Sequence, residues 1–86
     1  MPRALTLQRT VVPQGDRERL LARARTLRSH YDAAQCHYWL FEDAELRGAF
    51  IEFVEAPDAG VLIAAQRASP HPVGVDPTRV YKEIVL

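Results

Sequence analysis

Two apolar, aromatic-rich runs separated by a short polar break dominate the hydrophobic pattern of this 86-residue chain. The first run is 38–41 (YWLF), the second is 50–54 (FIEFV), and the break spans 42–48. β-Branched and aromatic runs of this length, bounded by turn-forming residues, are typical of strands joined in a hairpin. We therefore expect strands at about 36–42 and 48–55.

Residues 4–12, which precede this hairpin, alternate between apolar and polar side chains. A period of two is typical of a strand with one buried face. Pro13 ends the strand, and Gln14 and Gly15 turn the chain. One face carries Leu5, Leu7 and Val11, and the other carries Thr6, Gln8 and Thr10.

The segment 16–34 is predicted to be a helix, because apolar residues recur along it three and four positions apart. Asp16 is the expected N-cap, since its side chain can accept a hydrogen bond from a free amide of the first turn. Five arginines flank the apolar stripe, which consists of Leu20, Leu21, Ala24, Leu27 and Tyr31.

A second helix is predicted at 58–68, because Pro57 blocks continuation of the preceding strand. Three prolines and a glycine make 69–78 a predicted loop. Residues 79–86 alternate again and are expected to form the last strand. The face that the second helix would bury holds Val61, Leu62, Ala65 and Ala68.

The order strand, helix, strand, strand, helix, strand is that of ferredoxin-like domains. We therefore predict a single α+β domain, 1–86, with a four-stranded antiparallel sheet and both helices on one face. Apolar residues occupy both faces of the second and third strands, so the open sheet face needs a cover. A second copy of the chain is the simplest cover, which predicts a homodimer packed sheet to sheet.

Composition and charge limit the classes of partner that the chain is expected to bind. The chain is 48% hydrophobic and 26% charged, with a net charge of zero, which argues against nucleic acid or membrane as the main partner. Residues 1–35 carry seven basic and three acidic groups, whereas 36–86 carry four basic and eight acidic. Either a solvated arginine-rich helix or attraction between subunits accounts for this asymmetry.

Cellular location and source follow from other features. The single cysteine excludes an internal disulfide, and no apolar run approaches the roughly 18 residues of a membrane span. The amino terminus lacks the apolar core of a signal peptide, so we expect a cytoplasmic protein. Ten arginines to one lysine suggest a GC-rich bacterial genome.

Residues 47–53 (RGAFIEF) look like the RNP1 motif of RNA-binding RRM domains, which share this topology. The aromatic residue at the third position of the motif is missing, and the first strand offers no aromatic residue to complete a stacking platform. With zero net charge as well, the sequence predicts no nucleic-acid partner.

The span from Leu5 to Ala68 resembles the dimeric α+β barrel superfamily, in particular the antibiotic biosynthesis monooxygenase-like group. The shared features are a strand ending in Val-Val-Pro, a helix that starts after a glycine, and a strand that opens at Cys36 with Trp39 at a usually aromatic position. Glu52 on the third strand and a helix opening at Asp58 complete the resemblance.

Two features depart from the family pattern. Val54 stands where such families often have the tryptophan of a Glu-x-Trp sequence. Members that oxidise aromatic substrates or degrade haem typically use an asparagine on the first strand and a histidine in or near the second helix. Here the first strand has Gln8, Arg9 and Thr10, and the second helix has no histidine.

The resemblance implies a cleft that takes a small apolar or aromatic molecule and, if the protein is an enzyme, cofactor-independent monooxygenase-like chemistry. The candidates for handling protons would then be Glu52 and His37, with Arg9 stabilising an anion or oxygen. A carboxylate in an apolar strand can have a raised pKa, although Glu52 could instead pair with Arg9 or Arg79. The candidate ligand-binding residues are Trp39, Tyr38, Phe50 and Gln8.

A second interpretation makes the protein a non-catalytic binding or assembly module whose aromatic hairpin is only core and dimer interface. A metal site is not expected: Cys36 and His37 are adjacent in a strand and face opposite sides, and His30 and His71 lack ligand spacing. We expect no cofactor, because the chain has no glycine-rich phosphate loop.

Overall fold

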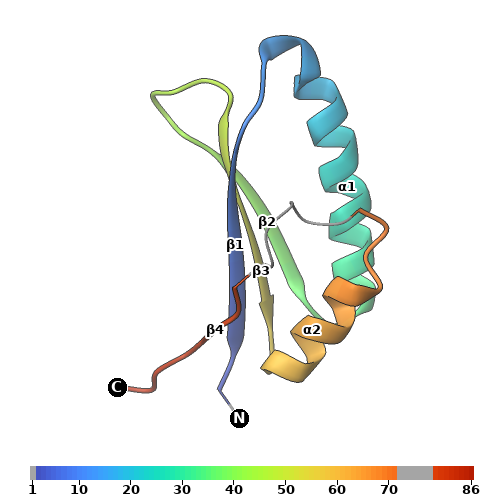
Figure 1. Ribbon diagram of the computed structural model, residues 1–86, viewed down its shortest axis with the longest axis vertical. Coiled ribbons are helices and arrows are strands. Elements are labelled where there is room, and N and C mark those ends of the chain that lie inside the picture. Colours follow the sequence, from blue (N-terminus) through green and yellow to red (C-terminus); the bar gives the residue numbers. More distant parts are fainter. Residues whose placement is uncertain (1, 72–78) are drawn as a thin grey trace.

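The computed structural model describes residues 2–71 and 79–86. The strands form one antiparallel sheet in the order β2-β3-β1-β4, and both helices lie on the same side of it (Figure 1). The predicted ferredoxin-like α+β fold is therefore confirmed. The elements are β1 (Ala4–Val11), a short 3-10 turn η1 (Gln14–Asp16), α1 (Arg17–Ala33), β2 (His37–Glu42), β3 (Ala49–Ala56), α2 (Ala59–Arg67) and β4 (Tyr81–Lys82).

The two helices begin and end within one residue of the predicted bounds. Asp58 caps α2, because its side chain accepts a hydrogen bond from the Val61 amide at 2.9 Å. Asp16 is the N-cap residue of α1, but its side chain makes no capping hydrogen bond and instead lies 4.0 Å from Arg19.

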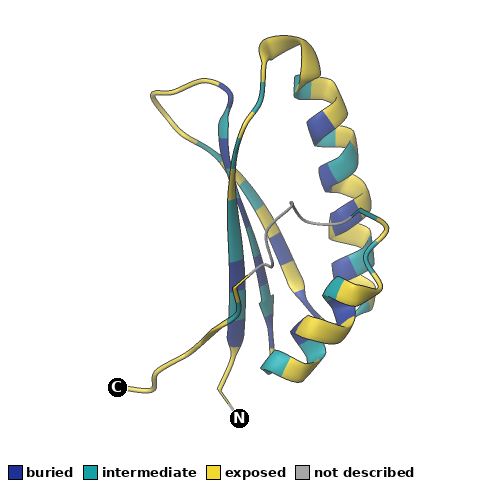
Figure 2. Cartoon of the chain, in the orientation of Figure 1, coloured by how far each residue is buried: buried dark blue, intermediate teal, exposed yellow. Residues whose placement is uncertain are grey.

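The core lies between the sheet and the helices. Figure 2 shows the buried positions of α1 on the side that faces the strands. The largest fully buried side chains are Leu27 and Tyr31 of α1 and Leu62 of α2. Smaller residues of the sheet, such as Ala4 and Ala56, leave room for the helices to approach.

The face of β1 that meets the helices is the more polar of its two faces. Ala4 and Thr6 are buried under the helices, whereas Leu5 and Leu7 are only half-buried and Val11 is 78% exposed. Thr6 is accommodated because its hydroxyl donates to the Arg79 carbonyl at 2.9 Å. The more apolar face of β1 therefore points away from the helices, toward the side of the sheet that no described element covers.

The last strand is much shorter than predicted. β4 comprises Tyr81 and Lys82 alone, and the Glu83 amide adds one more bond to the Arg3 carbonyl at 2.8 Å. Because β1 starts at Ala4, the residues after Glu83 have no strand beside them, and 84–86 are exposed. Most of the predicted loop 69–78 lies outside the described residues.

The hairpin between β2 and β3 depends on Gly48, the only described glycine with a positive φ, at 91°. Its carbonyl accepts a hydrogen bond from the Val12 amide at 2.8 Å, which joins the hairpin to the end of β1. A Cβ at this position would lie 2.6 Å from the Val12 carbonyl oxygen. Gly48 is therefore required both by its backbone angle and by close packing.

We expect Gly48→Ala to lower the free energy of unfolding by about 2 kcal/mol, through backbone strain and this contact. Gly15→Ala is the matched control, because a Cβ added there would meet no atom within 4 Å and its φ is not positive. Urea denaturation of both variants measures the difference. Equal stabilities for the two variants would contradict this account of the hairpin.

Candidate functional site

The sheet separates the candidate residues onto two faces. The inner face, toward the helices, carries Glu52, Tyr38, Phe50 and Gln8. The other face carries Arg9, His37 and Trp39. We call this second face the outer face; its residues are Leu5, Leu7, Arg9, Val11, His37, Trp39, Phe41, Ala49, Ile51, Phe53 and Glu55.

The inner face centres on Glu52, which is 4% exposed. Its Oε1 accepts a hydrogen bond from Arg23 Nη2 of α1 at 2.8 Å, and its Oε2 accepts one from the Tyr38 hydroxyl at 2.6 Å. The arginine partner is thus Arg23, and neither Arg9 nor Arg79. With both oxygens engaged, the Glu52 carboxylate is held in place between α1 and β2.

Arg23 is the residue of this cluster that sequence reasoning missed, because it belongs to the arginines that flank the helix stripe. It lies three positions after Leu20 and four before Leu27, so its Cα belongs to the same helix face as the core residues. This spacing could have indicated from the sequence that Arg23 faces the sheet.

Tyr38 and Tyr31 stack in parallel beside Glu52, with ring centroids 6.1 Å apart. Burial, followed by the hydrogen bond to Glu52, raises the pKa of Tyr38 above its ordinary value. Burial also raises the pKa of Tyr31. Both phenols therefore stay protonated near neutral pH, and the Tyr38 hydroxyl donates to Glu52.

A small cavity lies between these rings and β1. Gln8 and Tyr31 are among the residues that line it, and neither Gln8 Oε1 nor the Tyr31 hydroxyl has a hydrogen-bond partner among the described residues. The nearby Ser69 hydroxyl donates to the His71 carbonyl at 2.9 Å instead. The cavity measures about 10 Å³, the space of roughly one water molecule, so it cannot take an aromatic ring.

Phe50 is buried and lies outside the described pockets. The Arg17 guanidinium covers its ring at 5.4 Å from the centroid, and Arg17 Nη1 donates to Glu42 Oε2 at 2.6 Å. Glu42 Oε2 also accepts from the Gly48 amide at 2.9 Å. These two donors lower the pKa of Glu42 to about 2. Glu42 thereby ties the hairpin loop to the start of α1.

The depressed pKa of Glu42 predicts its effect on acid stability. A lowered folded pKa stabilises the fold above the unfolded value of 4.5, and this contribution is lost as the pH falls toward 2. We expect Glu42→Gln to lose less stability than the wild type over this pH window, measured by thermal unfolding. Glu45→Gln, in the loop that follows β2 and in no ion pair among the described residues, is the control. A Glu42→Gln profile with the full wild-type acid loss would refute the assignment.

The outer face is apolar at its centre. In the middle row of the sheet, Leu7 pairs with Phe53 and Phe53 with Trp39. Phe41 is 53% exposed and packs edge-on against Phe53 at 5.8 Å between centroids. His37 stacks on Trp39 at 5.8 Å. His37 and Glu52, the two predicted proton-handling residues, therefore lie on opposite sides of the sheet.

A groove of about 460 Å³ runs between α1 and the edge strand β2. This volume is within the usual range of small-molecule sites. Trp39 and Tyr38, both predicted ligand-binding residues, line it, whereas Gln8 and Phe50 do not. We call it the α1–β2 groove; it is lined by Leu21, Ala24, Arg25 and Arg28 of α1 and by Tyr38, Trp39 and Leu40 of β2.

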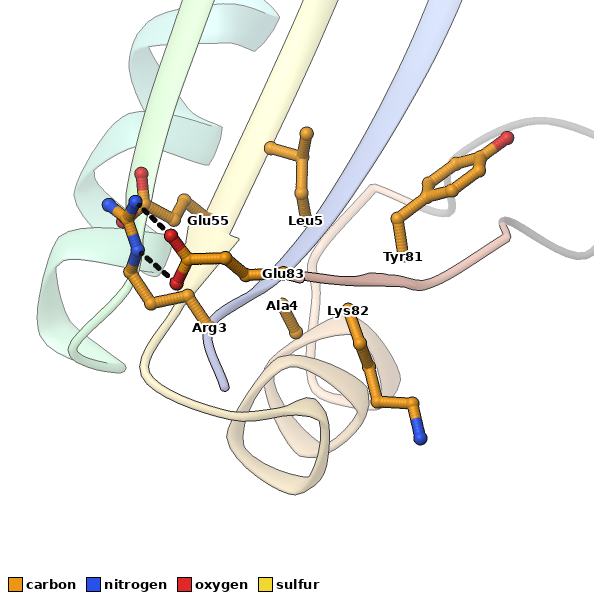
Figure 3. A pocket seen from close by; sticks show the side chains of 7 residues that line it. All are labelled: Arg3, Ala4, Leu5, Glu55, Tyr81, Lys82 and Glu83. Carbon is orange, nitrogen blue, oxygen red and sulfur yellow. Dashed lines mark hydrogen bonds and ion pairs between the residues drawn. The ribbon is translucent and has the colours of Figure 1, made fainter. Parts of the chain in front are cut away.

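A second pocket, of about 270 Å³, lies where β1 meets β4. Arg3 donates to both carboxylate oxygens of Glu83, at 3.1 and 2.9 Å, and to Glu55 at 3.1 Å. In Figure 3 the Glu83 carboxylate points toward Arg3, whereas the Tyr81 ring points away from it. Both carboxylates engage Arg3, so its guanidinium is not free to bind an anion in this pocket.

The described residues contain neither a cluster of metal-ligating side chains nor a helix that could span a membrane. No group of three or more histidine, cysteine, aspartate or glutamate side chains is arranged to hold a metal ion in that part of the chain. Within the same residues, neither helix has the length and apolar character needed to cross a membrane.

Comparison with known proteins shows the fold alone. No protein-family model matches the chain, and no curated protein matches it. A solved structure of a conserved Bacteroides thetaiotaomicron protein of unknown function, described as a possible oxidoreductase, is 21% identical with a TM-score of 0.70; the match covers 79% of this chain and 74% of that one. Rv0793 from Mycobacterium tuberculosis is 18% identical with a TM-score of 0.62, over 100% of this chain and 96% of that one.

Proposed function

We propose that this protein is a homodimer of the dimeric α+β barrel type, similar to the antibiotic biosynthesis monooxygenase-like group, and that it binds a small aromatic molecule in the α1–β2 groove. The observation that carries the binding proposal is the groove itself. Its volume of about 460 Å³ suits a one- or two-ring molecule, and its walls combine apolar and aromatic side chains with the two arginines Arg25 and Arg28 in about equal share.

The outer face supports the homodimer. Both helices pack on the inner face, so in the described chain the apolar centre formed by Leu7, Trp39, Ile51 and Phe53 is left without a cover. Packing this face on its own copy about a two-fold axis removes it from water. Trp39 belongs both to the outer face and to the α1–β2 groove, so in the proposed dimer the groove is entered from the side of α1.

Ligand binding is the function we favour over oxygenation. The resemblance implies cofactor-independent oxygenation, with Glu52 and His37 handling protons. Both oxygens of Glu52 are engaged by Arg23 and Tyr38, and His37 lies on the opposite face. Oxygenation stays a prediction of the resemblance, whereas the groove provides a site of the right size.

Calorimetric titration with 2-naphthamide and 2-naphthoate tests the proposal. We expect at least one probe to bind and to change the emission of Trp39, the only tryptophan of the chain. Leu21→Gln removes apolar contact area inside the groove and should weaken binding about tenfold. Ile63→Gln, on α2 and outside the groove, is the matched control. Absence of binding by both probes, or equal affinity in Leu21→Gln, would refute the proposed site.

A further inference from the structure

We infer that the α1–β2 groove selects an aromatic carboxylate, with the ring against Trp39 and the carboxylate held by Arg25 and Arg28. This inference rests on the proposed function, because it names the class of ligand for the same groove. It begins from the distribution of positive charge on α1.

Helix α1 carries five arginines, and three of them form ion pairs. Arg17 pairs with Glu42 at 2.6 Å, Arg19 lies 4.0 Å from Asp16, and Arg23 pairs with Glu52 at 2.8 Å. Among the described residues, Arg25 and Arg28 take part in neither an ion pair nor a side-chain hydrogen bond. These two arginines are also the only charged residues that line the groove.

The spacing of the groove residues on α1 places charge and apolar surface together. Leu21, Ala24, Arg25 and Arg28 are separated by three, one and three positions, which brings all four onto one helix face. Leu21 and Ala24 supply an apolar surface, and both arginines are exposed beside it. A ligand in the groove therefore meets an apolar wall and two guanidinium groups on the same side.

Strand β2 supplies the opposite wall. Trp39 is 40% exposed in the single chain, with His37 stacked on its ring, and Leu40 is half-buried next to it. A flat ring is favoured against this wall, because aromatic faces stack with little loss of side-chain freedom. No acidic residue lines the groove, so nothing within it repels an anion.

The two guanidinium groups determine which polar group of an aromatic ligand the groove prefers. A planar guanidinium matches a carboxylate in geometry and donates two parallel hydrogen bonds to it. Two such groups one helical turn apart can engage both carboxylate oxygens. An uncharged amide of the same shape keeps the ring contacts but loses the charge-assisted bonds, so the groove distinguishes the two by charge.

The experiment compares 2-naphthoate with its uncharged isostere 2-naphthamide by calorimetric titration. We expect the carboxylate to bind at least about tenfold more tightly, the usual advantage of charge-assisted hydrogen bonds. In the double variant Arg25→Gln/Arg28→Gln, the affinity for naphthoate should fall to that for the amide, while the affinity for the amide is unchanged. Added sodium chloride should weaken binding of the carboxylate only.

Arg19→Gln is the matched control, because it removes one positive charge from the same helix outside the groove. It should keep the preference for the carboxylate. Equal affinity of the wild type for both probes, or a preference that survives the double variant, would overturn the carboxylate inference and leave the proposed binding site standing. Failure of both probes to bind would instead overturn the proposed function.

Discussion

Phe53→Glu should convert the protein from a dimer to a monomer at micromolar concentration, as measured by sedimentation velocity. Phe53 is the central residue of the outer face, because it pairs with Leu7 on one side and with Trp39 on the other. A carboxylate there would lie between two apolar surfaces with no partner to neutralise it. We expect the dimer dissociation constant to rise at least about 100-fold, as for a central interface residue.

Two comparisons make this result interpretable. Ile63→Glu places the same charge at an exposed apolar residue of α2, away from the outer face, and should leave the dimer intact. Far-UV circular dichroism should show that Phe53→Glu stays folded, because its side chain does not belong to the core between sheet and helices. A wild-type protein that sediments as a monomer, or a Phe53→Glu variant that stays a dimer, would contradict the proposed assembly.

Most of the fold could be predicted from the sequence, because periodicity, prolines and caps mark where its elements begin and end. The stripe of α1 shows the strength of this signal: Leu20, Leu27 and Tyr31 recur at helical spacing and are all buried. The short β4 could not be predicted from its own residues. Its length depends on where β1 begins, which is information held in another part of the chain.

The faces of the strands were harder to assign than the strands themselves. Tyr38 and Trp39 are neighbours of similar size and hydrophobicity, and alternation alone does not say which one faces the helices. In β1 the more apolar set, Leu5 and Leu7, points outward. In the proposed homodimer a second sheet covers this face, which would account for its apolar residues.

The difficulty of assigning strand faces also explains why the predicted site residues do not form one site. All of the predicted site residues lie in the sheet, but the parity of the strands divides them between its two faces. Trp39 and Tyr38 nevertheless line one groove, because β2 is an edge strand and residues of both parities reach the space beside it. The contribution of α1 to this groove depends on how the helix packs on the sheet, which spacing within the helix does not reveal.

The cluster around Glu52 leads to the second large effect. We expect Glu52→Gln to lower the free energy of unfolding by about 3 kcal/mol, because it leaves the largely buried Arg23 without its counter-charge. The Arg23 side chain is 30% exposed and that of Glu52 is 5% exposed, so water compensates for little of the loss. For a domain of this size, such a loss lowers the thermal midpoint by roughly 12 to 24 °C.

Glu55→Gln is the matched control for this change. Glu55 lies three residues further along β3, on the outer face, and pairs with Arg3, whose side chain is 59% exposed. Because solvent screens that pair, its removal should cost less than about 1 kcal/mol. A double-mutant cycle with Tyr38→Phe separates the two hydrogen bonds of Glu52, since that substitution removes only the bond from the hydroxyl. If Glu52→Gln were as stable as Glu55→Gln, the buried carboxylate would not be what holds α1 to the sheet at Arg23.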